Sequence, residues 1–569
     1  MAGQQPSGLP VPEGTKTVTE GQATILHQGE NVFYNPAQVI NRDLSVAVLR
    51  YFVKQRREEI ENGTLKAPRQ KRTPAEAIQL KEAGGAEGPV QRPKLDENIR
   101  ILEGLAASGL RSIRYALEIE GVKRIDANDL DEAAAAAVRQ NLELNDSKAS
   151  GLVRPTQGDV RLAALQNPDG YEAVDLDPYG SPAQFLDTAV QAVSEGGLLL
   201  VTATDMAVLC GNNGEACWSK YGCYPLHRPY CHEMALRILL ASLEAHANRH
   251  KRHIVPVLSL SIDFYIRVFV RVYTSAEKVK DSASKQMYVY QSSGCDSFFT
   301  QPVGRKSPKG KGFKFAPGHG PVVPQQCPET GSGWIMGGPF WSQPIHDQAW
   351  VKGILAILEA DKGNFQAYSK VRGLLTSASE ELPDVPLYYN LHTMCKTLRV
   401  TPPGNSTVRS AIVNAGYRVS GTHANPLGLK TDAPPEVMWD IMRCWVAEHP
   451  SKKPLDPDSY EGKLLSKEPK IQANFARANG AQRSQHGPRV PRFIPNPEAN
   501  WGPKSRHKVA RWDASEGNDS VPARTSAPEQ ATAIANAAGE GDASIDTAMP
   551  EQAGTVAEEK TKDDKQHVT

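Results

Sequence analysis

The chain contains no run of eighteen apolar residues, the least that a helix needs to cross a membrane. It has only eight cysteines in 569 residues, and residues 1–30 lack the apolar core of a secretory signal. No arginine precedes Arg42, so the start does not resemble an Arg-rich transit peptide either. We therefore expect no membrane span, reduced thiols and an intracellular protein.

An excess of charge of either sign is also lacking. The 65 Lys and Arg residues balance 64 Asp and Glu residues, which leaves a net charge of +1. Any attraction to a nucleic acid must therefore come from local basic surface. The apolar fraction of 40% is ordinary for a globular protein, and the length predicts two or three domains.

Changes in composition divide the chain. Residues 24–275 are expected to form the main domain, 276–450 a smaller one and 451–512 a basic extension. Residues 1–23 and the Ala/Glu/Asp/Ser-rich residues 513–569 are expected to be disordered. Residues 54–93, rich in Lys, Arg, Glu, Gly and Pro, are interpreted as an insertion. It contains two basic clusters, at 54–57 and 69–72. Three interpretations of them stay open: a nuclear-import signal, a surface that contacts RNA, and solvated charge without a partner role.

Strand and helix patterns alternate regularly from residue 98 onward. Strands are expected at 99–102, 124–127, 153–156, 173–176 and 197–203, with helices at 110–120, 132–144, 161–165 and 182–193 between them. This alternation predicts an α/β fold with a doubly wound parallel sheet. A helix at 232–247 and an apolar run at 254–272 would complete the sheet, and on that run Arg267 and Arg271 would share one face.

The strand at 173–176 leads into Asp177-Pro178-Tyr179-Gly180. Pro178 lacks a backbone donor and fixes its own φ, so the chain must leave the sheet there. Ligands of open α/β sheets bind at this edge. Asp177 can accept a proton from an amine while the ring of Tyr179 stacks on a nucleobase. The alternative is a strand-ending turn whose aspartate caps the next helix.

Other strand ends carry residues that suit a nucleoside cofactor. The small residues 104–109 let a ligand approach the backbone, and Asp129 is placed to accept from a ribose diol. Asp159 and Val160 can read an adenine edge, and Glu103 can accept from an ammonium group. The G-x-G-x-x-G fingerprint of nicotinamide enzymes is absent. S-adenosylmethionine, which has no phosphate, therefore fits better, and a methyltransferase is favoured over a dehydrogenase.

Several motifs then resemble the eukaryotic-type tRNA (guanine-26 N2)-dimethyltransferases, over residues 24–447. They are Phe-Tyr-Asn-Pro at 33–36, Asn-Arg-Asp at 41–43, and the stretches at 107–115, 128–129, 177–180, 341–347 and 422–434. The resemblance implies a class I methyltransferase domain with a smaller α+β C-terminal domain. It also implies transfer of methyl groups from S-adenosylmethionine to the exocyclic N2 of guanine 26 in tRNA, usually twice.

The resemblance also implies roles for single residues. Asp177 would bind and deprotonate the amine, the Pro178 carbonyl would orient it, and Phe33 and Tyr179 would sandwich the base. The residues that would hold the cofactor are Arg42, Arg111, Asp129, Asp159 and Val160.

We expect no metal site. Many relatives carry a four-cysteine zinc site, but Ser292 and Thr330 replace one cysteine of each pair here, leaving Cys295 and Cys327. The cysteines and histidines between 210 and 232 lack the spacing of a zinc knuckle.

Three features of the second half complete the interpretation. The basic, Gly-rich stretch 305–314 suits contact with tRNA phosphates, although a solvated loop is the competitor. Helices expected at 387–398 and 406–415 suggest a small winged-helix-like unit. Tyr388 and Tyr389 are expected to be core residues, with stacking on a base as the alternative. The basic extension would either wrap tRNA or lie along the domain surface. The expected location is the nucleus, and a mitochondrial pool stays open as an addition to it.

Other functions stay open. An rRNA or DNA amino-methyltransferase would not be expected to share the stretches 341–347 and 422–434. A non-catalytic tRNA-binding protein on the same fold would have no need of the acidic residues Asp129, Asp159 and Asp177. The sequence does not decide the oligomeric state.

Overall fold

The computed structural model describes residues 16–27, 34–65, 99–168, 170–450, 456–481, 490–498 and 501–502. These residues belong to one compact unit that spans 1–510, and the second unit, 511–569, contains none of them. The expected disordered tail at 513–569 therefore lies outside the described residues. Among the described helices, none is both long enough and apolar enough to cross a bilayer.

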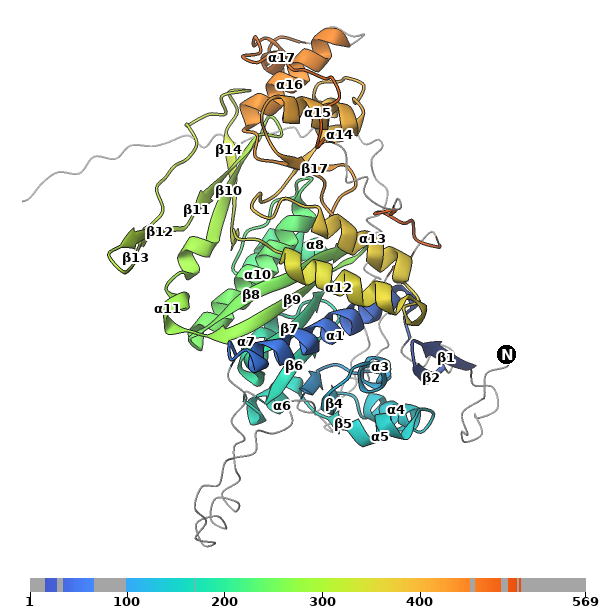
Figure 1. The fold of residues 1–569 in the computed structure, drawn as a ribbon. Coiled ribbons are helices and arrows are strands. Elements are labelled where there is room, and N and C mark those ends of the chain that lie inside the picture. Colours follow the sequence, from blue (N-terminus) through green and yellow to red (C-terminus); the bar gives the residue numbers. More distant parts are fainter. Residues whose placement is uncertain are drawn as a thin grey trace, which may run out of the picture. The chain divides into compact units, whose positions relative to one another are not determined.

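A seven-stranded sheet in the order β5-β4-β3-β6-β7-β9-β8 forms the centre of the molecule (Figure 1). Strands β5, β4, β3, β6 and β7 run parallel, and β9 is antiparallel to both of its neighbours. The expected Rossmann-like α/β fold is confirmed. The strands are β3 (Ile99–Glu103), β4 (Val122–Asp129), β5 (Val153–Gln157), β6 (Tyr171–Leu176), β7 (Val193–Ala203), β8 (Arg252–Ile262) and β9 (Tyr265–Thr274).

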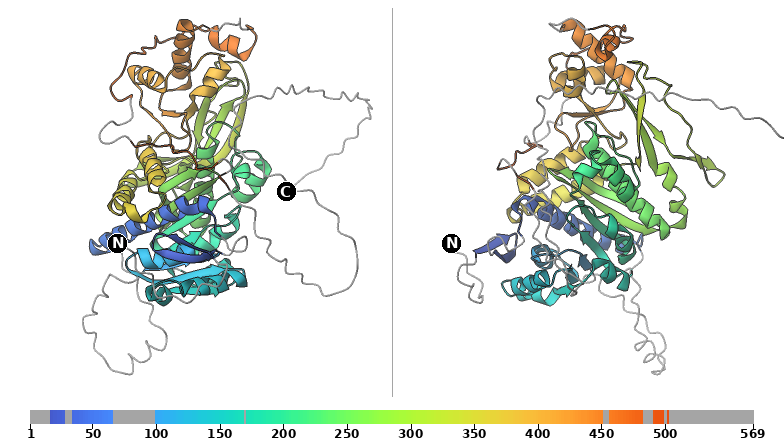
Figure 2. Two further views of the ribbon diagram at one scale, coloured as in Figure 1. Left: turned by 90° about the vertical axis from the view of Figure 1, so that its right-hand side faces the viewer. Right: turned by 180° about the vertical axis from the view of Figure 1, so that it is seen from behind.

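Helices cover both faces of this sheet (Figure 2). Alternate residues of β7 show why: Leu198 and Leu200 enter one buried core, while Leu199 and Val201 enter the other. A strand whose two faces are both covered contains a nearly continuous apolar run, as β7 does at residues 198–201. The helices of this part are α3 (Leu110–Glu118), α4 (Glu132–Leu142), α5 (Ser147–Leu152), α6 (Val160–Gln166), η3 (Ala183–Phe185), α7 (Leu186–Ala192) and α10 (Cys231–Arg249).

The apolar run expected at 254–272 is a hairpin, since β8 turns into β9 at Asp263 and Phe264. Asp263 has a φ of +46°, a left-handed conformation that aspartate tolerates in tight turns. Arg267 and Arg271 do lie on one face of β9, as expected, and both are buried. Their partners come from β6 and from the long helix α1.

The insertion begins later than residue 54, because helix α1 (Val39–Glu61) continues through that point. Arg56 is buried and donates hydrogen bonds to the carbonyls of Glu195 and Gly196 (3.0 and 3.1 Å). Glu59 pairs with Arg271 at 2.7 Å. Sequence composition could not reveal these long-range partners. The second basic cluster, 69–72, lies outside the described residues.

The ordered chain also begins earlier than residue 24. Strands β1 (Lys16–Glu20) and β2 (Ala23–His27) form an antiparallel hairpin. Glu20 is completely buried and binds Arg42, and Asn141 and Asn145 accept from the backbone of β2. The hairpin is thus held by the main domain, and the expected disorder of residues 16–23 is wrong.

The second half of the chain packs in two places. Helices α12 (Gln348–Ala360) and α13 (Tyr368–Ser379) share a core with α1 and the main sheet. A three-stranded sheet, β11-β10-β14, and a separate β12-β13 hairpin precede them. These strands are β10 (Gln286–Ser292), β11 (Phe298–Pro302), β12 (Gly304–Lys309), β13 (Gly312–Pro317) and β14 (Trp334–Trp341), after the short α11 (Ala276–Val279) and η4 (Ser282–Lys285).

A third core lies in the C-terminal part of the described chain, around Trp439 and Met394. It contains both expected helices, α14 (Leu391–Thr397) and α15 (Asn405–Asn414), with α16 (Pro435–Glu448), α17 (Tyr460–Leu465) and a sheet of β15 (Tyr389–Asn390), β17 (Gly428–Thr431) and β16 (Val419–Ser420). Tyr388 and Tyr389 are buried, as predicted. Ile471, Ala473 and Phe475 of the basic extension pack against this core, while Arg492 pairs with Glu380 at the end of α13.

Candidate active site

Asp177 follows β6 at the C-terminal edge of the sheet and is held by two side chains. Arg111 of α3 donates to Asp177 Oδ2, and Asn41 of α1 donates to the same oxygen at 3.4 Å. The carboxylate side chain is 20% exposed. The amide of Ala183 donates to Ser181 Oγ, at 3.3 Å, and not to Asp177. Asp177 is therefore not a helix cap, and one edge of its carboxylate remains open to a ligand.

The loop after Asp177 is anchored to the next strand. The amide of Gly180 donates to Thr204 Oγ1 at 2.7 Å, and the amide of Thr204 donates to the Gly180 carbonyl at 3.0 Å. Gly180 has a φ of +78°, which L side chains rarely adopt. Pro178 is buried, whereas Tyr179 is 45% exposed. The loop thus presents an aromatic ring at the surface beside a carboxylate.

Asp175 holds Arg111 in place from below. It is fully buried and accepts from Arg111 Nη1 (3.2 Å), Arg267 Nη2 (2.9 Å) and the Tyr115 hydroxyl (2.6 Å). Burial alone would raise the pKa of Asp175, but the guanidinium groups of Arg267 and Arg111 bring it below its ordinary value. The carboxylate stays charged and fixes the position of the arginine that reaches Asp177.

Glu103 ends β3 next to the same arginine. It accepts from Ser112 Oγ, and its Oε1 lies 3.4 Å from Arg111 Nε. Burial nevertheless raises the pKa of Glu103 to about 8, against the lowering by Arg111. An additional cation would stabilise the charged form of a buried carboxyl whose pKa is raised in this way. The site is chemically suited to an ammonium group.

The loop at 104–109 is shaped by its own backbone and by Asp129. The amide of Ala106 donates to the Asn128 carbonyl, and the amide of Ala107 donates to Asp129 Oδ2, both at 2.8 Å. Gly109 has a φ of +74°, and a Cβ there would lie 2.8 Å from Val138. Asp129 therefore lies beside the loop, and its carboxylate retains acceptor capacity for a ligand. Its predicted contact with a ribose stays a prediction.

Asp159 and Val160 lie at the end of β5, on the other side of that loop. Asp159 caps α6, accepting from the Arg161 amide at 2.8 Å, and its pKa is lowered by the Arg161 side chain. Val160 is buried against Gly104, where an added Cβ would be 2.7 Å from its methyl group. The structure thus brings together the strand ends that carry Glu103, Asp129, Asp159, Val160 and Asp177.

Arg42 is engaged elsewhere. Its guanidinium binds Glu20 (2.7 Å from Nε to Oε2) and the Asn35 carbonyl (3.1 Å), and it lies over the ring of Tyr34 at 5.3 Å from the ring centre. Its predicted contact with a cofactor stays a prediction. The predicted role of Phe33 lies outside the described residues.

Sequence reasoning missed the support of this site from distant elements. Ser45 of α1 accepts from Arg267 Nη2 at 2.8 Å, and Asn41 accepts from Arg111 Nη1 at 3.0 Å. Thr202 of β7 accepts from Arg267 Nη1 at 2.6 Å. The sequence did contain one signal for this support: Arg267 is a charged residue within an apolar strand. A charged residue in such a strand must have a buried partner.

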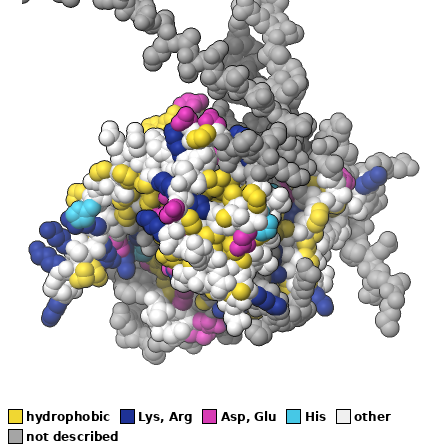
Figure 3. Space-filling view, turned by 90° about the horizontal axis from the view of Figure 1, so that it is seen from above, with side chains coloured by type: hydrophobic (Ala, Val, Ile, Leu, Met, Phe, Trp, Pro, Cys, Tyr) yellow, Lys and Arg dark blue, Asp and Glu magenta, His cyan; other side chains and the backbone are white. Residues whose placement is uncertain are grey.

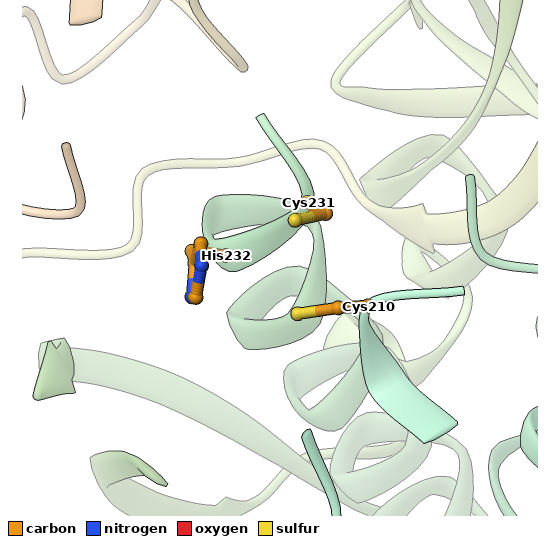
Figure 4. Close-up of side chains that lie close together, drawn as sticks. All are labelled: Cys210, Cys231 and His232. Carbon is orange, nitrogen blue, oxygen red and sulfur yellow. The ribbon is translucent and has the colours of Figure 1, made fainter. Parts of the chain in front are cut away.

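Two groups of side chains among the described residues have the composition of metal ligands. Cys210, Cys231 and His232 have their ligand atoms within 4.8 Å of one another. Figure 4 shows both sulfur atoms pointing toward the side on which His232 lies. Folding thus assembles residues whose spacing in the sequence resembled no knuckle. The absence of a structural zinc stays a prediction.

The second group, His346, Glu381 and His423, has no lone pair to spare on its histidine nitrogens. The amides of Ser259 and Ser261 donate to His346 Nδ1 (3.4 Å) and His423 Nε2 (3.0 Å). The opposite nitrogens therefore carry hydrogens, and His423 Nδ1 donates to Glu381 at 2.6 Å. This group is a hydrogen-bonded cluster between β8 and the C-terminal half.

The stretches that correspond to the relatives' zinc site do meet in space. The sulfurs of Cys295 and Cys327 are 3.8 Å apart. Ser332 Oγ lies 3.0 Å from Ser292 Oγ and 2.9 Å from Thr330 Oγ1. Hydroxyl hydrogen bonds thus connect the positions at which cysteines are replaced.

Comparisons with known proteins agree with this arrangement. The family model described as "N2,N2-dimethylguanosine tRNA methyltransferase" matches residues 14–443. The chain is 49% identical over 519 residues to tRNA (guanine(26)-N(2))-dimethyltransferase 1 of Arabidopsis thaliana, covering 86% of this chain and 87% of that protein. It is 33% identical to the Saccharomyces cerevisiae protein named tRNA (guanine(26)-N(2))-dimethyltransferase, mitochondrial, covering 87% and 92%.

The fold is similar to that of Trm1 from Pyrococcus horikoshii, solved as a complex with S-adenosyl-L-methionine. The TM-score is 0.58 at 27% sequence identity, and the match covers 74% of this chain and 98% of that one. With a matching family model over most of its length and relatives of high identity, this chain belongs to the N2,N2-dimethylguanosine tRNA methyltransferase family.

Proposed function

We propose that this protein transfers methyl groups from S-adenosylmethionine to the exocyclic N2 of guanine 26 in tRNA and forms N2,N2-dimethylguanosine. The observation that carries the proposal is the setting of Asp177. Its carboxylate is partly open, is oriented by Arg111 and Asn41, and lies in the loop that exposes Tyr179. Family membership supplies the nucleotide and its position.

The residues at the strand ends fit the cofactor. Glu103 would accept from the ammonium of its methionine part, because burial leaves this carboxyl short of positive charge. Asp129 would accept from the ribose hydroxyls, and Asp159 and Val160 would face the adenine edge. Leu130, which is 73% exposed directly after Asp129, offers an apolar surface for the base. When bound, the cofactor supplies the methyl group.

The chain's own residues would prepare the amine. The lone pair of guanine N2 is delocalised into the ring, so the amine must be held by acceptors and oriented toward the methyl group. Asp177 would accept one amine hydrogen and then the proton, and the Pro178 carbonyl would accept the other. Tyr179 and Phe33 would hold the two faces of the base. Arg42, which binds Glu20 and lies over Tyr34, would order the chain beside Phe33 and contact the cofactor.

The β12–β13 hairpin is our candidate for contact with tRNA phosphates. It forms a two-stranded sheet of its own, and almost all of its residues are at least partly exposed. Its tip carries Lys309, Lys311 and Lys314, and Phe313 is 53% exposed. Lys and Arg side chains gather at the left edge of the molecule seen from above, on the side where the hairpin lies in Figure 1 (Figure 3).

The location proposed is the nucleus, with a mitochondrial pool. A relative from Saccharomyces cerevisiae is named mitochondrial. Of the two basic clusters considered for nuclear import, the first includes the buried Arg56, which leaves residues 69–72. A fluorescent fusion of the full chain, with and without Arg69→Ala and Arg72→Ala, tests the proposal. Unchanged nuclear accumulation of the variant would show that residues 69–72 are not the nuclear-import signal.

The decisive experiment combines the protein with labelled S-adenosylmethionine and unmodified tRNA, and then maps the methylated nucleotide. Label on N2 of guanine 26 is expected, first as the monomethyl and then as the dimethyl product. Label only in rRNA or DNA would point to another amino-methyltransferase. No label at saturating cofactor, with tRNA still bound, would point to a non-catalytic binding protein.

A further inference from the structure

Residues 177–182, designated here the catalytic loop, are attached directly to a neighbouring helix. After β7 the chain forms α8 (Met206–Leu209) and α9 (Gly214–Tyr221). The hydroxyl of Tyr221, at the end of α9, lies 2.7 Å from Ser181 Oγ in the catalytic loop and donates to Asp205 Oδ1 at 2.9 Å. Whatever binds beside α9 therefore binds next to the proposed reaction centre.

A groove of about 360 Å³ lies between α9 and α10, with β10 and β14 contributing to its wall. This volume suits a single small ligand or one unit of a polymer. Its lining combines an indole, cationic side chains and small residues, namely Trp218, Lys220, Tyr221, His246, Arg249 and Gln286, with Pro339 beside them. No aspartate or glutamate is among the residues that line it.

Trp218 and Arg249 of the groove are available to a ligand, while Lys220 and His246 have carboxylate neighbours, Asp205 and Asp187. Trp218 is 53% exposed, so a face of its indole ring is open to a stacking partner. Arg249 donates to the Ala245 carbonyl at 3.1 Å within its own helix, and no ion pair to it is found in the described part of the chain. Lys220 lies 3.4 Å from Asp205. The pKa of His246 is lowered by burial and by Arg249, so at neutral pH this ring is a neutral hydrogen-bonding group.

We infer that this groove, designated here the α9 groove, binds a nucleotide of the tRNA that neighbours the target guanosine. The base would stack on Trp218, and Arg249 and Lys220 would contact the phosphates. This inference rests on the proposed function. An exposed aromatic ring with nearby cations is the usual platform for an unpaired nucleotide. Removing a guanine from its stack also leaves its neighbours without a stacking partner, which a groove beside the catalytic loop can supply.

The first test compares Trp218→Ala and Arg249→Gln with the full-length wild-type protein. Loss of one stacked base should raise KM for tRNA about tenfold, and loss of a phosphate contact should lower the salt dependence of tRNA binding. Kd for S-adenosylmethionine and the melting temperature should not change. Matched controls are Leu165→Ala, an exposed apolar residue of α6, and Arg139→Gln, an exposed arginine of α4. Equal KM values for groove and control variants would overturn the inference.

A second test locates the contact. Unmodified tRNA carrying 4-thiouridine at a position adjacent to guanine 26 is irradiated in complex with the wild-type protein, and the cross-linked peptide is identified. A cross-link within α9 or the facing part of α10 is expected. A cross-link confined to other elements, in a preparation that methylates tRNA, would overturn the groove while leaving the proposed function intact. A preparation that methylates no tRNA would instead overturn the function on which the groove depends.

Discussion

Asp175 and Asp177, two residues apart in the sequence, lie in different environments. Asp175 is buried between Arg111 and Arg267, while Asp177 keeps one-fifth of its side chain exposed. An uncompensated charge is costly only where water cannot reach it. The first residue should therefore determine the stability of the site and the second its chemistry.

Substitution should separate these two roles. Asp175→Asn leaves Arg111 and Arg267 facing a neutral amide, and we expect the free energy of unfolding to fall by about 3–5 kcal/mol. Asp177→Asn should change it by about 1 kcal/mol or less, because Arg111 keeps Asp175, yet methyl transfer should fall at least about a hundredfold. Thermal unfolding and single-turnover methylation measure the two effects. A stable Asp175→Asn protein would contradict the assignment, as would an active Asp177→Asn protein.

Glu103 predicts a pH dependence of cofactor binding. Burial raises the pKa of its carboxyl to about 8 in the free protein, so below that pH the group is protonated, and an arriving ammonium must expel the proton. Affinity for S-adenosylmethionine should therefore rise with pH, by about tenfold per unit between about pH 6 and 7. Calorimetry in buffers of different ionisation enthalpy should detect about one released proton. In Glu103→Gln both the pH dependence of affinity and the proton release should vanish. If they persist, a group other than Glu103 takes part in the proton exchange.

At the scale of single elements, α1 shows how a helix can be hidden in a charged sequence. Its later turns read as an insertion because they are rich in Lys, Arg and Glu. Arg56, however, reaches two carbonyls at the start of β7, and Glu59 reaches Arg271 on β9. Partners from distant strands make these charged turns part of the folded domain.

Adjacent arginines of α1 should respond differently to truncation. Arg56→Ala removes the donor to the part-buried Glu195 carbonyl and one of two guanidinium donors to the buried Gly196 carbonyl, which keeps Arg271 Nε at 2.7 Å. We therefore expect a loss of about 1–2 kcal/mol in unfolding free energy. Arg57, which lies 3.9 Å from the exposed Glu120, pairs in solvent; Arg57→Ala should cost less than about 0.5 kcal/mol. Denaturant or thermal unfolding compares the two. Similar losses would mean that α1 ends before Arg56 in solution.

At the scale of the whole compact unit, the stretches 341–347 and 422–434 connect the two halves of the chain. His346 and His423 accept amide hydrogens of β8, and Lys430 pairs with Glu233 of α10 (2.9 Å) and with Glu381 (3.2 Å). The family resemblance identified these two stretches but implied no role for them. Their contacts show that they bind the C-terminal half to the main sheet.

This connection predicts sensitivity to acid. Burial lowers the pKa of His346 to about 3, so the folded protein keeps the ring neutral while the unfolded chain takes up a proton below about pH 6.5. Stability contributed by the neutral ring is therefore lost as the pH falls below that value, by about 2 kcal/mol at pH 5. Melting temperatures of the wild type and His346→Gln at pH 7, 6 and 5 test this. The melting temperature of His346→Gln should fall less with decreasing pH than that of the wild type. The control His392→Gln, at an exposed histidine, should follow the wild type.

Much of the sheet and the edge that carries the site could be predicted from the sequence, because strand and helix periods are local properties. The order of Glu103, Asp129, Asp159 and Asp177 along the chain follows from them, since parallel strands present their C-terminal ends at one edge. Only the tertiary structure decided that Arg111 orients Asp177, that α1 supplies Asn41 and Ser45, and that residues 16–23 belong to the fold. Each of these depends on a partner far away in the sequence, and buried charges take their meaning from such partners.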